Sequence, residues 1–117
     1  MQVYFIPSSD LKISFSPFIP QPLTFLAVSR TLEAVGVSAY LGAAHLLTDP
    51  TILEAAGSIL TLEARHQSIL NTFNGGSFAG QSFDIPLAPE QVLALAGGFL
   101  KGCHAQDLGL TGEFWCT

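Results

Sequence analysis

The spacing of apolar side chains predicts two long helices in the middle of the chain. From residue 50 to about residue 72, one set of positions recurs in steps of four and three, which places it on one face of an α-helix. That set comprises Ile52, Ala56, Ile59, Glu63, His66 and Leu70. An earlier set, over about residues 24–47, comprises Glu33, Val37, Tyr40, Ala44 and Leu47. The pattern therefore predicts two amphipathic helices, each with titratable side chains in its apolar face.

Turn-forming residues separate these two helices and end the second. Asp49 suits an N-cap, and Pro50 suits the first helical position, where its missing N–H costs nothing. Asn74, Gly75 and Gly76 adopt left-handed turns readily and are expected to end the second helix. Because the turn between the helices is short, we expect them to be antiparallel.

The flanking segments predict little regular structure. Residues 1–23 contain four prolines between Phe and Ile residues, which excludes a long helix. We expect an extended arm that lies on apolar surface, with a disordered tail as the alternative. Residues 73–117 are expected to be loop and coil with one short helix over about residues 89–101. The expected fold is all-α: an antiparallel helical hairpin over residues 24–72, a short C-terminal helix and extended termini.

Composition narrows the classes of partner. The 117 residues suffice for one domain at most. Because 49% of the residues are hydrophobic and only 11% are charged, the surface of this domain is expected to be unusually apolar. Four scattered Lys and Arg residues do not favour nucleic acid as a partner. No uncharged helical run reaches the roughly 18–20 residues of a membrane span. The N-terminus lacks the basic region and the unbroken apolar segment of a signal peptide.

Three titratable side chains are expected to meet between the helices. Glu33 lies fifteen residues before the middle of the turn and Glu63 fifteen after it, so both stand roughly 22 Å from the turn, with His66 one helical turn beyond Glu63. Burying unpartnered carboxylates costs several kcal/mol. Three forms of compensation are open: a divalent metal ion, an ion pair with Arg30, Arg65 or a protonated His66, and a hydrogen-bond network with raised carboxylate pKa values.

These residues and the segments around them resemble a known family. Glu33 followed by Glu63-x-x-His66 resembles half of the di-iron ligand pattern of ferritin-like four-helix bundles. The segments "VGVSAYLGAA", "TDP" and "LEARH", and the downstream "QSFDIPLAPEQVLALAGGFLKGC", are similar to the ferritin-like domain of fungal stress-responsive and plant desiccation-related proteins. The resemblance covers about residues 30–103. It implies that the hairpin is the second half of such a bundle and that Glu33, Glu63 and His66 are candidate ligands for iron or another divalent metal. It also suggests a secreted protein, although no signal peptide is evident.

Residues 1–23 depart from the family pattern. They contain no Glu and no His, so the expected counterparts of the three ligands are absent from this chain, and an intact di-iron site within one monomer is not expected. We expect a truncated ferritin-like structural or interaction protein of the stress- or desiccation-related kind, with self-association or another helical partner. The alternative is a homodimer in which two hairpins supply four carboxylates and two imidazoles to one metal site. An incomplete gene product is the third interpretation.

An enzymatic role is the least favoured class. The chain has no nucleophile–base arrangement, phosphate-binding loop or dinucleotide glycine motif, so the sequence assigns no catalytic residue.

Cys103 and Cys116 are predicted to lie at the surface or to form a disulfide with each other, and not to bind metal. They are thirteen residues apart, and a disulfide that closes a loop of this size contributes about 3 kcal/mol to stability. Thiol titration of the unfolded, unreduced protein measures the outcome: two free thiols exclude the bridge.

Overall fold

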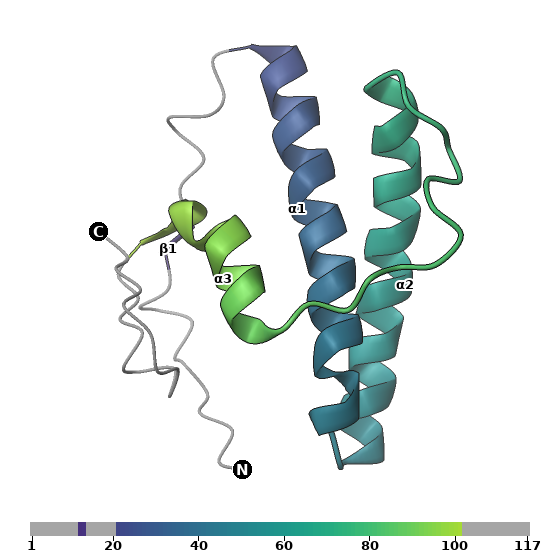
Figure 1. The fold of residues 1–117 in the computed structure, drawn as a ribbon, viewed down its shortest axis with the longest axis vertical. Coiled ribbons are helices and arrows are strands. Elements are labelled where there is room, and N and C mark those ends of the chain that lie inside the picture. Colours follow the sequence, from purple (N-terminus) through teal and green to yellow (C-terminus); the bar gives the residue numbers. More distant parts are fainter. Residues whose placement is uncertain (1–11, 14–20, 102–117) are drawn as a thin grey trace.

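Two long antiparallel helices form the centre of the structure. The computed structural model describes residues 12–13 and 21–101, so Cys103, Cys116 and most of the N-terminal arm lie outside the described residues. Helix α1 spans Pro22–Ala43 and helix α2 spans Pro50–Phe73. Figure 1 shows them side by side, with a short helix, α3 (Pro89–Ala96), on the side of α1 away from α2. The predicted fold class, an all-α helical hairpin with a short C-terminal helix, is confirmed.

Proline and polar caps set the ends of the hairpin helices. Helix α1 begins at Pro22, two residues earlier than the pattern predicts, because proline is favourable at the first helical position. It gives way to a single 3-10 turn, η2 (Ala44–Leu46), before the connection to α2. The Asp49 carboxylate accepts hydrogen bonds from the backbone N–H groups of Thr51, at 2.8 Å, and Ile52, at 3.3 Å. The predicted N-cap therefore satisfies two amide groups that α2 leaves unpaired.

The far end of α2 is tied to the start of α1. The Asn74 side chain donates hydrogen bonds to the carbonyl oxygens of Leu70, at 2.8 Å, and Leu26, at 3.2 Å. Gly75 follows with a φ of 76°, a left-handed conformation that glycine adopts without steric cost. This turn links both helices at the open end of the hairpin.

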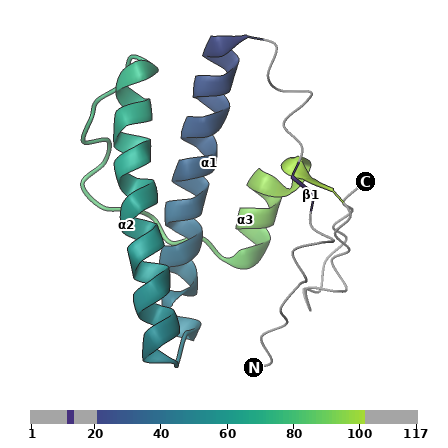
Figure 2. The same ribbon diagram turned by 180° about the vertical axis from the view of Figure 1, so that it is seen from behind.

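The linker from α2 to α3 crosses one broad face of the hairpin. The Leu87 backbone N–H donates to the Ser38 carbonyl at 3.0 Å, and a Cβ atom on Gly42 would overlap the Leu87 carbonyl oxygen. Glycine at this position therefore lets the linker approach α1 closely. The linker runs over the nearer face in Figure 1, and Figure 2 shows the opposite face. We call that opposite side the open face.

Helix α3 is shorter than the predicted range of about 89–101. It ends at Ala96, and a 3-10 turn, η3 (Gly97–Phe99), follows. Two adjacent glycines, Gly97 and Gly98, disfavour continuation of the α-helix. The backbone then forms strand β2 (Leu100–Lys101), which pairs antiparallel with β1 (Lys12–Ile13), Lys12 opposite Lys101.

The core lies on α1, and α2 is covered on one side only. Val37 is 1% exposed and Val35 is 7% exposed, since α1 lies between α2 and α3. The side of α2 directed at α1 is half-buried and comprises Ala56, Leu60, Glu63, Gln67 and Leu70. The prediction that Ile52 and Ile59 belong to the core face was wrong, because they are 52% and 39% exposed. They lie beside the contact between α2 and α1, where no other described helix covers them. None of the described helices has the length and hydropathy needed to cross a membrane.

Gly42→Ala is expected to lower the free energy of unfolding by about 1–3 kcal/mol, because the new methyl group displaces the Leu87 carbonyl. Gly57→Ala is the matched control: a Cβ there meets no atom within 4 Å, so the change should raise helix stability by roughly 0.5–1 kcal/mol. Urea unfolding followed by circular dichroism measures both. Equal effects of the two substitutions would contradict the close contact between the linker and α1.

Candidate carboxylate and histidine site

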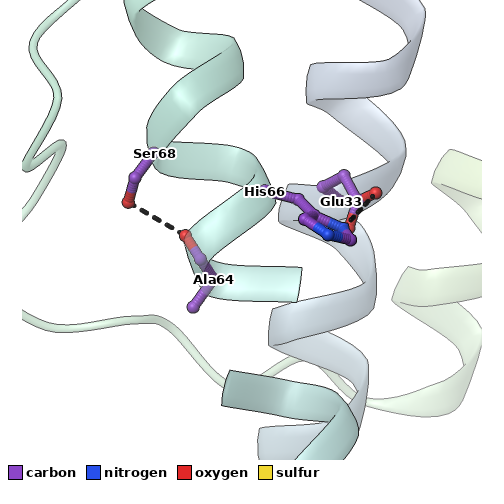
Figure 3. Close-up of polar contacts among 4 residues, drawn as sticks. All are labelled: Glu33, Ala64, His66 and Ser68. Carbon is purple, nitrogen blue, oxygen red and sulfur yellow. Dashed lines mark hydrogen bonds and ion pairs between the residues drawn. The ribbon is translucent and has the colours of Figure 1, made fainter. Parts of the chain in front are cut away.

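A polar bridge joins the middle of α1 to the middle of α2. Figure 3 shows the Glu33 side chain, from α1, beside the His66 ring, from α2, with 3.2 Å between Glu33 Oε1 and His66 Nδ1. A carboxylate can only accept, so Nδ1–H is the donor. When the ring is neutral, this hydrogen bond leaves the lone pair on Nε2, the arrangement in which a histidine commonly binds a metal ion. The Glu33 side chain is 27% exposed and that of His66 is 46% exposed.

The Ser68 hydroxyl, also drawn in Figure 3, does not take part in this bridge. It donates to the Ala64 carbonyl within α2 at 2.9 Å. Serine in a helix commonly satisfies its hydroxyl in this way. The Ser68 hydroxyl is therefore satisfied by a hydrogen bond within α2.

Glu63 lies one helical turn before His66, and its carboxyl group packs against α1. A Cβ atom on Gly36 would stand 2.5 Å from Glu63 Oε2 and 2.9 Å from Oε1, so glycine at this position makes room for the carboxyl group. Oε2 is buried and has no hydrogen-bond partner among the described residues. Buried polar atoms in proteins are nearly always hydrogen-bonded. An oxygen of this kind indicates a missing partner or a bound proton.

Burial and neighbouring charge favour the protonated form of Glu63. Burial raises the pKa of Glu63, and the carboxylate of Glu33 raises it further, while His66 acts in the opposite direction. The pKa of Tyr40 is also raised, first by burial and then by the charge of Glu63. Tyr40 therefore belongs to the same polar cluster as the three predicted residues.

The structure bears on the three ways, considered above, in which the cost of the buried carboxylates can be offset: a metal ion, an ion pair or a hydrogen-bond network. His66 pairs with Glu33, whereas neither Arg30 nor Arg65 forms an ion pair with the cluster. The raised pKa of Glu63 agrees with the third form, although Oε2 has no hydrogen bond to any described residue. Two carboxyl groups and an imidazole are also suitable donors for a divalent metal ion, and the partnerless Oε2 is compatible with one. Within the part of the chain that is described, however, no group of three or more His, Cys, Asp or Glu side chains is arranged to hold a metal. The described residues thus contribute at most a partial set of donors.

Sequence reasoning placed Gly36 and Tyr40 on α1 but did not assign either to the site. Both carried a signal, because they stand three and seven residues after Glu33 and so share its helix face. From the sequence alone, the simplest role of Gly36 is to allow another helix to pack closely. In the structure, the carboxyl group of Glu63, and not a helix backbone, occupies the space beside it.

Comparison with known proteins identifies one family. The sequence profile of the ferritin-like domain matches residues 4–76, which include the whole hairpin and begin upstream of the segments that carry the resemblance described above. No curated protein and no solved structure matches the chain.

Glu63→Gln is expected to stabilise the metal-free protein at neutral pH, by on the order of 1 kcal/mol, because it removes a buried charge without a partner. A raised pKa means that protonated Glu63 favours folding fully below the ordinary carboxyl pKa, and that this contribution is lost as pH rises through the raised value. The difference in Tm between Glu63→Gln and the unmodified protein should therefore be small near pH 4 and grow towards pH 7.

The measurement is thermal unfolding in chelator across this pH range. Glu54→Gln, on an exposed part of the same helix, serves as the control and should show no such trend. A Tm difference for Glu63→Gln that is constant with pH would contradict the burial of the Glu63 carboxyl group.

Proposed function

Because the chain belongs to the ferritin-like domain family, we propose that it is a ferritin-like helical interaction protein whose hairpin functions by associating with a second helical hairpin. The observation that carries this proposal is the exposure of large apolar side chains along α2. Those that are exposed on this helix are Ile52, Leu53, Ile59, Leu62, Ile69 and Phe73. In a four-helix bundle, a second pair of helices covers such positions.

The composition supports the same proposal. A surface with few charged residues and many exposed apolar side chains is typical of an interaction site and is costly in an isolated monomer. The similarity of the "VGVSAYLGAA", "TDP" and "LEARH" segments to stress-responsive and desiccation-related proteins supports a structural role under stress or water loss. This role requires association but no chemical reaction.

Metal binding by two associated hairpins is the second candidate function. It is favoured by the buried Glu63 Oε2 beside the Glu33–His66 pair. Glu33, Glu63 and His66 of two copies would supply four carboxylates and two imidazoles, and a bound divalent ion such as iron would supply Lewis-acid or redox chemistry.

The residues of this chain have separable roles in such a site. Glu33 holds the orientation of the His66 ring through Nδ1. Gly36 leaves space for the Glu63 carboxyl group, whose Oε2 atom is buried.

Light scattering and metal analysis of the purified chain test both candidates. Association predicts a mass above that of one chain. Metal binding predicts bound iron, manganese or zinc and a Tm that rises with added metal by mass action. Glu63→Ala should then abolish the metal content and the metal-dependent rise in Tm, and Glu54→Ala should change neither.

If the role is structural only, Glu63→Ala should leave stability unchanged or increase it, since it removes an unpaired buried carboxyl group. A monomer without bound metal would contradict both candidate functions.

A further inference from the structure

The open face of the hairpin carries two mainly apolar stripes with heptad spacing. On α2, six exposed residues follow one another in steps of four and three; this α2 stripe consists of Ala55, Ile59, Leu62, His66, Ile69 and Phe73. On α1, a second set has the same spacing; this α1 stripe consists of Phe25, Ser29, Leu32, Gly36, Ala39 and Ala43. Such spacing is typical of helices whose side chains interlock with those of a partner helix.

Both stripes lie on the side of the hairpin that the linker does not cross. The linker contacts α1 at Ser38 and Gly42, which stand more than about 90° around the helix from the middle of the α1 stripe at 100° per residue. Gly36 belongs to the α1 stripe and contacts Glu63, so this stripe is adjacent to α2. The two stripes are therefore adjacent and lie on the open face of the hairpin, the side shown in Figure 2.

We propose that this surface binds a second copy of the same chain, with α2 on the partner's α2 and α1 on the partner's α1, each pair antiparallel about a two-fold axis level with Ala64. This inference rests on the proposed function and specifies the partner, the surface and the register. The height of the axis along the helices is the one at which large side chains of each stripe face small side chains of the partner's copy of that stripe.

The α2 stripe is complementary to itself in this register. In antiparallel heptad packing, a and d positions of the two helices face each other. With the axis at Ala64, Ile59 faces the partner's Ile69, and Leu62 faces the partner's His66. The largest member, Phe73, which is 64% exposed, faces the smallest, the partner's Ala55. A parallel pairing would instead place Phe73 against Phe73 and His66 against His66.

The α1 stripe independently indicates nearly the same axis. Self-pairing that is centred on Ala34 places Phe25 against the partner's Ala43 and Leu32 against the partner's Gly36. Large side chains again face small ones. Two contacts give the relative height of α1 and α2: Glu33 with His66, and Gly36 with Glu63. In both, the two residue numbers add to 99, so residues whose numbers add to 99 lie at one height. Ala64 is then level with residue 35, so the two axes agree within one residue, about 1.5 Å.

The polar cluster is incomplete among the described residues of one chain and meets its copy in this dimer. Glu63 Oε2 has no partner among the described residues, and they contain no three-donor metal group. With the axis at Ala64, Glu63 and the partner's Glu63 are offset by only two residues, about 3 Å along the helix axis. His66 and the partner's His66 are offset by four residues, about 6 Å. A foreign helix would need its own matching residues, whereas a second copy provides them by symmetry.

The first test compares two neighbouring substitutions on α2 by sedimentation, at several protein concentrations, in chelator and with added Mn²⁺. Leu62→Glu places a charge in the α2 stripe and should weaken the dimer about 100-fold or more, because two carboxylates are buried per dimer. Thr61→Glu adds the same charge at an exposed position outside the stripe and should leave the dimer intact. Circular dichroism checks that both variants remain helical, as expected for residues exposed in one chain.

The second test measures the register by disulfide crosslinking in a protein with Cys103→Ser and Cys116→Ser. Mild oxidation of Ile59→Cys mixed with Ile69→Cys should give a crosslinked dimer, and neither variant should crosslink alone, because each cysteine lies about 15 Å from its own copy along the axis. Crosslinking of Ile59→Cys alone would overturn the antiparallel arrangement. A dimer that Leu62→Glu does not weaken would overturn this surface but leave the proposed association standing. An unmodified chain that stays monomeric in both buffers would overturn both.

Discussion

The packing of the Glu63 carboxyl group against α1 at Gly36 is the interaction on which the polar cluster depends. A side chain at residue 36 would occupy the space of the carboxyl group, so the Glu63 side chain would have to move away from this part of α1. This contact lies at the same height along the hairpin as the Glu33–His66 pair, in which Glu33 Oε1 is 3.2 Å from His66 Nδ1. The polar cluster is thus assembled where α1 and α2 pack against each other.

This arrangement buries Glu63 Oε2 between α1 and α2 with no hydrogen-bond partner among the described residues. A buried carboxyl oxygen without a partner lowers stability, and proteins usually pair or neutralise such atoms. Protonation is the compensation available to one chain, and it agrees with the direction in which the pKa of Glu63 shifts. A ligand or a second chain would be a further compensation. In ferritin-like bundles the corresponding cost is offset by metal ions held between two helix pairs, which connects the electrostatics of this seam with the assembly of the protein.

The two sides of the hairpin differ in how they are covered. On one side, the linker and α3 pack on α1 through the hydrogen bond from Leu87 to Ser38 and the close approach at Gly42. On the other, apolar residues such as Leu62 and Phe73 remain exposed. A helix contributes stability mainly through the faces that it buries. The uncovered side of α2 is therefore where association would increase stability most.

Local sequence signals determined the hairpin by themselves. Pro50 and Asp49 start α2, the apolar spacing predicts both helices, and the short turn makes them antiparallel, so that counting residues was enough to place Glu33 level with Glu63 and His66. These features depend on contacts within a few residues or on helix geometry alone. Only the tertiary structure decided which apolar residues are buried. Ile52 and Ile59 fit a helical face as well as Leu70 does, but burial depends on where the neighbouring helix lies, and one helix covers only one side of another. The roles of Gly36 and Gly42 were likewise decided by the tertiary structure, because a glycine in the sequence does not reveal whether a carboxyl group, a backbone carbonyl or open space lies beside it.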